Sequence, residues 1–176
     1  SYGVESNPYL SVDGTSGRVT LSTPVDREVT PQFLVTFYAS DEQGNRVSSS
    51  YVIPVTDVND NAPQFLNAPY SLRIREDERE STQVYTDQLI TIVDPDAGNN
   101  GEVQLYCYFA PGNSQEQEAC ATFDLSLEQS GSQYRAVIRI KKALDYETIT
   151  SYRLHLQATD RGTPSRQNDT IVTIEV

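Results

Sequence analysis

The sequence predicts an all-β protein built as antiparallel sandwiches or barrels, and three observations support this fold class. Apolar and polar residues alternate over many short segments, as in strands with one buried face. Stretches rich in Gly, Pro, Asn, Asp and Ser separate these segments at short intervals. No segment shows a sustained helical period. Many short strands with regular turn signals are typical of all-β domains.

The most regular strand pattern spans residues 33–40, where Phe33, Val35, Phe37 and Ala39 fall on one face. Successive side chains of a strand point to opposite sides of the sheet, so we expect a half-buried strand here. The same alternation occurs in segments 18–22, 50–55, 70–74, 102–109, 134–140, 152–159 and 170–176. Together these segments account for most of the chain.

Several sequence landmarks occur twice, which indicates a repeat with a unit of domain size. The segment VDREVTPQFLVTFYASD (25–41) is matched by LDYETITSYRLHLQATD (144–160). Four residue pairs are each 119 positions apart: Asp26 and Asp145, Glu28 and Glu147, Ala39 and Ala158, Asp41 and Asp160. We therefore expect a linker at 58–61 and a complete repeat at 62–176.

The first repeat is expected to be incomplete. The opening of the second repeat, residues 70–101, has no counterpart before Asp26, so residues 1–57 correspond to the C-terminal half of a repeat. Half a sandwich exposes sheet edges and an apolar face that isolated sandwiches do not tolerate. We expect the missing part to be a separate segment or to come from a neighbouring molecule.

Charge and composition narrow the classes of function. The 176 residues include 25 acidic and 13 basic side chains, which gives a formal net charge of -12. This balance argues against binding to nucleic acid or anionic membranes and favours cations as ligands. An enzyme is poorly supported, because no cleft-forming constellation accompanies the acidic clusters, and no small-molecule substrate is expected.

Oxygen donors are densest in TDVNDNAPQF (56–65), which places two aspartates and two asparagines within five positions. Calcium takes about six to eight oxygen ligands from carboxylates, amides and backbone carbonyls. A second group, DPDAGNNG (94–101), spaces Asp94 and Asp96 so that both can face one ion. The alternative is that these turns only cap strands and keep the surface soluble. Acidic landmarks that recur at a fixed offset favour calcium.

Five kinds of motif, found in one order, resemble the signature elements of extracellular cadherin repeats. They are DREV (26–29) and DYET (145–148), YASD (38–41) and QATD (157–160), DVNDNAPQF (57–65), IRED (74–77) and DPDAGNNG (94–101). The resemblance covers nearly the whole chain. It implies tandem Greek-key β-sandwiches of seven strands each, with three Ca2+ ions at each complete joint between repeats.

The resemblance also implies a ligand set for the joint within this chain. The first repeat and the calcium-binding linker contribute Asp26, Glu28, Asp57, Asn59 and Asp60, with the backbone carbonyls of Val58 and Asn61. The second repeat contributes Asp94, Asp96 and Asp160, with the carbonyl of Asn100. Half-sites for adjacent joints are implied at Asp41 on one side, and at Glu76, Asp145 and Glu147 on the other.

One ligand of the family pattern has no counterpart in this chain. The family places a glutamate on the first strand of the upper repeat, and that strand is absent here. Glu5 does not replace it, because it precedes Glu28 by 23 positions whereas Glu76 precedes Glu147 by 71.

The two cysteines, Cys107 and Cys120, are too few for a disulfide-built scaffold and match no zinc motif. Their spacing alone leaves open whether they pair. The resemblance implies an oxidising extracellular setting, in which we expect them to form a disulfide. The same setting makes Asn168, in the sequon NDT, a candidate glycosylation site. The segment between the cysteines is either a closed surface loop or a partner-binding excursion.

Two functions follow from the resemblance. In the first, the chain is an extracellular part of a single-pass plasma-membrane protein, and calcium ions at its joints stiffen a rod for cell-cell adhesion. In the second, these repeats themselves recognise other cadherin molecules, homophilically or heterophilically. The chain contains no tryptophan, so the tryptophan exchange used by some cadherins cannot operate here. This favours the rod.

Overall fold

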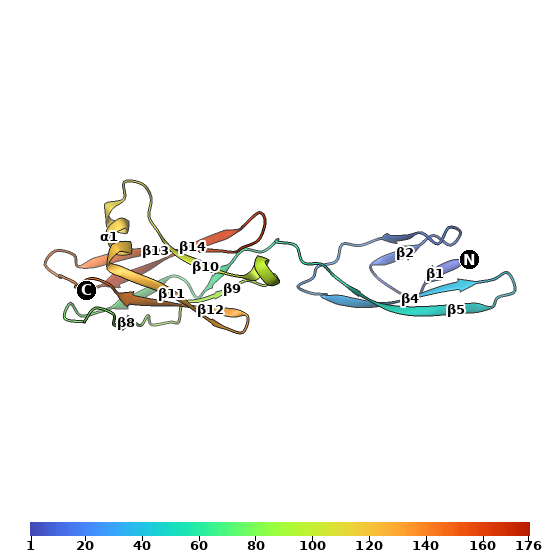
Figure 1. Ribbon diagram of the computed structural model, residues 1–176, viewed down its shortest axis with the longest axis horizontal. Helices are drawn as coiled ribbons and strands as arrows, with labels where there is room; N and C mark the ends of the chain where they lie inside the picture. The colour runs from blue at the N-terminus through green and yellow to red at the C-terminus, as the bar shows by residue number, and fades with distance from the viewer. The chain divides into compact units, whose positions relative to one another are not determined.

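The computed structural model describes all residues from Ser1 to Val176. The chain forms two compact units, the first unit Ser1–Asp57 and the second unit Val58–Val176. Strands make up most of the regular structure in both units (Figure 1). The prediction of an all-β fold is confirmed.

The first unit consists of five strands: β1 (Tyr2–Val4), β2 (Leu10–Val12), β3 (Val19–Leu21), β4 (Gln32–Ser40) and β5 (Arg46–Pro54). One antiparallel sheet has the order β1-β4-β5, and β2 pairs with β3 in a separate two-stranded sheet. The hairpin between β4 and β5 turns at Gly44, whose φ of 84° favours glycine. Figure 1 shows these two long strands side by side.

The apolar face of the first unit is only partly covered. Val35 on β4 is 1% exposed, but its cross-strand neighbour Tyr51 is 53% exposed and Val47 is 72% exposed. In the second unit, by contrast, Val172 is fully buried at the position 119 residues after Ile53. The exposed face of β5 is consistent with an incomplete sandwich, but the assignment of 1–57 as half a repeat stays a prediction.

The second unit contains nine strands, one 3-10 helix and one α-helix. In chain order these are β6 (Gln64–Leu66), β7 (Tyr70–Arg73), β8 (Gln83–Val84), β9 (Thr91–Val93), η1 (Gly98–Gly101), β10 (Gln104–Tyr108), α1 (Ser114–Thr122), β11 (Phe123–Ser130), β12 (Gln133–Ile140), β13 (Ser151–Thr159) and β14 (Gln167–Glu175). One sheet has the order β10-β13-β14-β7, and the other has the order β11-β12-β9-β6, with β8 also paired to β12.

Nine strands correspond to the seven expected of a Greek-key repeat because two strands are interrupted. β6 pairs with β9 in one sheet, and β7 pairs with β14 in the other. Between them Asn67 has a positive φ of 62°, so the chain changes direction and passes from one sheet to the other. β8 and β9 both pair with β12, so they are two parts of one strand.

The core of the second unit lies between its two sheets. On β13, Leu154, Leu156 and Ala158 are fully buried, and they alternate with exposed or half-buried residues as the sequence pattern predicted. The ring of Phe123 packs edge-on against Tyr152, with ring centroids 5.2 Å apart. The burial of apolar surface from both sheets stabilises this unit.

The α-helix α1 was not predicted, because the segment between the two cysteines was expected to be a closed surface loop or a partner-binding excursion. Its residues are good helix formers, and Asn113 caps its start by accepting a hydrogen bond from the backbone N of Glu116 at 3.2 Å. Within α1 only Ala119 and Thr122 are buried. A helix with so little buried surface has no apolar period for a sequence pattern to reveal.

Candidate calcium-binding sites

The linker residues Asn59 and Asn61 are held against loops of the second unit. The backbone N of Asn61 donates to Asp96 Oδ2 at 3.1 Å, and its side-chain amide donates to Asp96 Oδ1 at 2.6 Å. The side-chain amide of Asn59 donates to the carbonyl of Pro164 at 2.6 Å, and the backbone carbonyl of Asn59 accepts from Arg166 Nε at 2.9 Å. These bonds fix the path of the linker over the end of the unit.

Three carboxylates lie buried at the same end. Asp94 is 6% exposed, Asp96 8% and Asp160 2%, and they are the only buried acidic residues in the chain. Asp160 accepts hydrogen bonds from the backbone N of Gly162 and of Arg166, and the backbone N of Asp96 donates to Asp94 Oδ1 at 3.0 Å. Buried carboxylates are costly unless they are paired or bind a metal.

These residues fit a calcium ion by their chemistry. The donors are all oxygens, from carboxylates, side-chain amides and backbone carbonyls, which is the set that calcium prefers. Carboxylate oxygens of Asp60 and Asp96 lie within 4.8 Å of one another. Asn59 Oδ1 is buried and accepts no hydrogen bond within the protein. A buried amide oxygen without a donor is rare unless an ion or water uses it.

Two glycines shape the loops around this group. A Cβ atom on Gly101, at the end of η1, would collide with the carbonyl of Asp96. A Cβ atom on Gly162 would collide with the side-chain amide of Asn59. Gly101 ends the DPDAGNNG motif, which the sequence pointed to, but Gly162, Pro164 and Arg166 were not predicted, although all three lie within six residues after Asp160.

The remaining implied ligands of the second unit are the backbone carbonyls of Val58, Asn61 and Asn100. The carbonyl of Val58 accepts from the backbone N of Asp60 at 2.8 Å. Asn100 lies in η1, where its backbone N donates to the carbonyl of Ala97 at 3.2 Å. Both residues lie in segments next to the buried carboxylates, and their role as ligands stays a prediction.

The first unit holds an acidic group of its own residues, formed by Asp26, Glu28 and Asp57. Asp26 Oδ1 accepts from the backbone N of Glu28 at 2.9 Å, so its side chain closes the turn that carries Glu28. Arg27 forms ion pairs with both other members, through Nη2 to Glu28 and through Nε to Asp57. The side chains of Arg27, Glu28 and Asp57 are between 15% and 20% exposed.

Burial and charge affect the pKa values in this group in opposite ways. Desolvation raises the pKa of the Glu28 carboxyl, although the Arg27 charge acts to lower it. Burial acts to lower the pKa of Arg27, but its hydrogen bond and charge interaction with Asp57 outweigh that effect and raise it. The guanidinium therefore remains a fixed positive charge beside two carboxylates.

Glu76, Asp145 and Glu147 form a second acidic group in the second unit, and their carboxylate oxygens lie within 4.8 Å of one another. Glu76 Oε2 accepts from the backbone N of Tyr146 at 3.1 Å. Asp145 closes its turn through the backbone N of Glu147 at 3.1 Å, as Asp26 does through Glu28. The hydrogen bond from the Thr148 hydroxyl lowers the pKa of Asp145. All three acidic residues are exposed.

Asp41 stands apart from these groups. It is exposed, and it accepts hydrogen bonds from the side chain and the backbone N of Asn45 at 2.7 and 2.8 Å. Its counterpart Asp160 is buried. The structure therefore does not bring Asp41 together with other candidate ligands.

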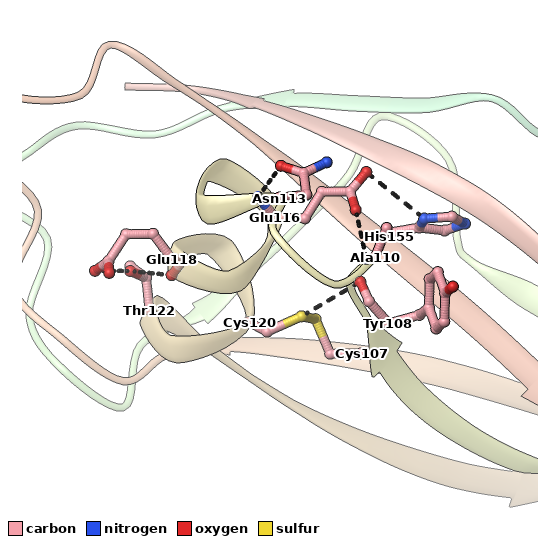
Figure 2. Close-up of a disulfide and its surroundings, with 9 residues drawn as sticks. All are labelled: Cys107, Tyr108, Ala110, Asn113, Glu116, Glu118, Cys120, Thr122 and His155. Atoms are coloured by element: carbon pink, nitrogen blue, oxygen red, sulfur yellow. Dashed lines mark hydrogen bonds and ion pairs between the residues drawn. A yellow bond between two sulfur atoms is a disulfide. The ribbon is translucent and has the colours of Figure 1, made fainter.

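The expected disulfide between Cys107 and Cys120 is present, with Cα atoms 5.6 Å apart. Figure 2 shows that it ties the C-terminal part of α1 to β10. Asn168 lies exposed on β14 with Thr170 of the sequon buried, and its glycosylation stays a prediction. None of the helices has the length and apolar character needed to cross a membrane.

Comparison with known proteins identifies the family. A model of the cadherin domain matches residues 70–176. Human Cadherin-23 is 35% identical over 159 residues, which cover 90% of this chain and 4% of that protein. The Drosophila melanogaster "Protocadherin-like wing polarity protein stan" is 32% identical over 174 residues, which cover 96% of this chain and 4% of that protein.

Solved structures agree with this match. Mouse Protocadherin-24 EC1-3 is 27% identical with a TM-score of 0.78, over 99% of this chain and 54% of that one. The structure titled "Protocadherin Gamma B2 extracellular cadherin domains 3-6" is 27% identical with a TM-score of 0.74, over 100% of this chain and 41% of that one. The chain belongs to the cadherin family.

Family membership defines the class of protein. Cadherin-domain proteins are adhesion proteins and not enzymes, so the expectation of a non-enzymatic function is confirmed. The chain spans about 4% of the length of the cadherins from human and Drosophila that it matches.

Proposed function

We propose that this chain is part of a calcium-dependent cell-surface adhesion protein, in which calcium ions at the linker hold neighbouring repeats in an extended rod. The observation that carries the proposal is the group of buried oxygen donors formed by Asn59, Asp94, Asp96 and Asp160. Asp96 accepts hydrogen bonds from the backbone N and the side-chain amide of Asn61, and Asp160 accepts them from the backbone N of Gly162 and of Arg166, so these donors are neutral. A divalent cation would balance the negative charge that the carboxylates bring together.

Calcium would also draw in the acidic residues of the first unit. We expect Asp26, Glu28 and Asp57 to complete the coordination that Asp60, Asp94, Asp96 and Asp160 begin, up to the three ions that cadherin joints hold. Because extracellular calcium sites commonly have affinities near millimolar, the sites would fill at extracellular calcium levels. We also infer that the protein that contains this chain presents its repeats outside the plasma membrane, where such calcium levels occur.

Calcium titration of two matched variants tests the metal site. Asp96→Asn removes one buried charge but keeps the size of the side chain, and we expect calcium affinity to fall at least about tenfold. Asp124→Asn removes an equivalent charge from an exposed position on β11 and should leave affinity unchanged. Equal affinity of the Asp96 variant and the unmodified chain in calorimetry would contradict the assignment.

A second candidate function is direct recognition of other cadherin molecules, homophilic or heterophilic. The observation that favours it is a set of exposed aromatic side chains around β10: Tyr106 is 48% exposed, Tyr108 40% and Phe109 42%. Aromatic residues are enriched at the centres of protein interfaces. Concentration-dependent self-association in analytical ultracentrifugation that Tyr106→Ser weakens would support homophilic recognition. A monomer at all concentrations would leave the rod as the better account.

A further inference from the structure

Arg27 forms ion pairs with two implied calcium ligands, Glu28 and Asp57. Its Nη2 contacts Glu28 Oε1, and its Nε contacts Asp57 Oδ1. These two carboxylates come from different segments of the first unit, one from the turn before β4 and one from the residue that follows β5 and ends the unit. A single guanidinium therefore joins them, and only 19% of its side chain is exposed.

The second unit provides an internal comparison. Tyr146 occupies the position 119 residues after Arg27, between Asp145 and Glu147. The turn is closed in the same way in both units, by a bond from the backbone N of the glutamate to the preceding aspartate. Tyr146 is 50% exposed. The two turns therefore share the same backbone hydrogen bond, but only the acidic group of the first unit contains an arginine.

Arg27 and a calcium ion would compete for the same atoms. A carboxylate oxygen that accepts a short, charge-assisted bond from a guanidinium has lost much of its capacity to coordinate a metal. A fixed positive charge beside the group also repels a divalent cation. Calcium can therefore use Glu28 and Asp57 fully only if Arg27 swings away, and the energy of its two ion pairs is subtracted from the energy of calcium binding.

We propose that Arg27 is an internal counter-cation that competes with calcium for Glu28 and Asp57 and so raises the calcium concentration at which this acidic group is filled. The inference depends on the proposed function, since it assumes that these carboxylates bind calcium. At low calcium Arg27 partly offsets the negative charge of the group and holds Asp57 beside the turn that carries Glu28. At high calcium the ion replaces it. The acidic group with Tyr146 lacks this competition.

The opposite role for Arg27 makes the opposite prediction. If the guanidinium only positions the two carboxylates for the metal, its removal leaves them poorly placed, and calcium affinity falls. If it competes, its removal frees the carboxylates, and calcium affinity rises. The direction of the change therefore distinguishes the two roles.

The test compares the whole chain with its Arg27→Gln variant. Calorimetry measures the calcium titration of each, and circular dichroism measures the unfolding temperature of each with calcium and with chelator. We expect the midpoint calcium concentration to fall by about tenfold, which corresponds to about 1.4 kcal/mol. The variant should unfold at a lower temperature than the unmodified chain in chelator. Because calcium binds it more tightly, the rise in unfolding temperature on adding calcium should be larger than for the unmodified chain.

Two further variants serve as controls. Arg46→Gln removes an arginine that pairs with Glu5 elsewhere in the first unit and should leave the calcium midpoint unchanged, which excludes a general effect of net charge. Arg27→Lys keeps the charge but loses the planar fork of donors, so it should shift the midpoint less and in the same direction as Arg27→Gln.

The outcomes separate this inference from the proposed function. An unchanged or higher calcium midpoint in both Arg27 variants would overturn the competition. If the unmodified chain itself binds no calcium in calorimetry, the proposed function fails instead. Should Arg27→Gln lose its strand content in chelator, the Arg27→Lys midpoint still decides the sign.

Discussion

At the scale of single residues, the same motif position has two different environments in this chain. Asp160 is 2% exposed and is held by the backbone N–H groups of Gly162 and Arg166. Asp41, its counterpart, is exposed, and hydrogen bonds from Asn45 hold the pKa of its carboxyl below the usual value. Residue type alone therefore does not create a site. The loops that surround the residue decide whether it is buried among other ligands.

Gly101 should be essential for the shape of the Asp94–Asp96 loop. In Gly101→Ala the new Cβ collides with the carbonyl of Asp96, so we expect the loop to shift and the unfolding free energy to fall by about 1–3 kcal/mol. Calcium affinity should fall with it, as calorimetry would measure. In Gly14→Ala the nearest atom to the new Cβ is a carbonyl oxygen 3.6 Å away, an ordinary contact. Equal stability of the two variants would contradict this account of Gly101.

Among the elements, β13 offers the sharpest test of the alternation of buried and exposed side chains along a strand. Leu156 is fully buried between the sheets, so Leu156→Ala should lower the unfolding free energy by about 2–5 kcal/mol. Arg153 points to the exposed face of the same strand, and Arg153→Ala should change it by less than about 0.5 kcal/mol. Urea unfolding of both variants measures the difference. Similar losses at the two positions would mean that the face assignment is wrong.

The disulfide and α1 act as one element on the surface of the second unit. The helix contacts β13 through Glu116, whose carboxylate lies 3.8 Å from His155 Nδ1 (Figure 2). Replacing both cysteines by serine should cost about 3 kcal/mol, because the 13-residue separation closes a short loop in the unfolded chain.

Hydrogen exchange and urea unfolding check the disulfide prediction separately. We expect faster exchange in α1 and much less change in β12, since Cys107 is only partly buried against the core whereas Ile138 on β12 is fully buried within it. If α1 exchanges at the same rate with and without the bridge, the helix is held by its packing alone.

Much of the fold could be predicted from the sequence because its signals are local. The alternation around Leu154 and the turn residues between strands are visible without any tertiary information, and the family motifs indicate the acidic ligands. The helix α1 could not be predicted, because it buries too few residues to produce a period. Gly162 and Arg166 were missed since their contacts with Asn59 join positions more than a hundred residues apart.

At the scale of the whole molecule, calcium is expected to control the arrangement of the repeats and not their internal fold. The second unit has its own buried core between two sheets, so we expect its strands to stay folded without the metal. The acidic residues proposed to meet at the linker repel one another by roughly 1 kcal/mol per close pair, even in water. A ligand that binds only the closed arrangement stabilises it as its concentration rises.

Small-angle scattering of the whole chain, with calcium and then with chelator, tests this central claim most directly. We expect a narrow, extended distribution of distances with calcium and a broad distribution with chelator, while circular dichroism shows the same strand content in both. Asp96→Ala should give the broad distribution at a calcium concentration that saturates the unmodified chain. A distance distribution that does not change on removal of calcium would contradict the assignment of these residues as calcium ligands.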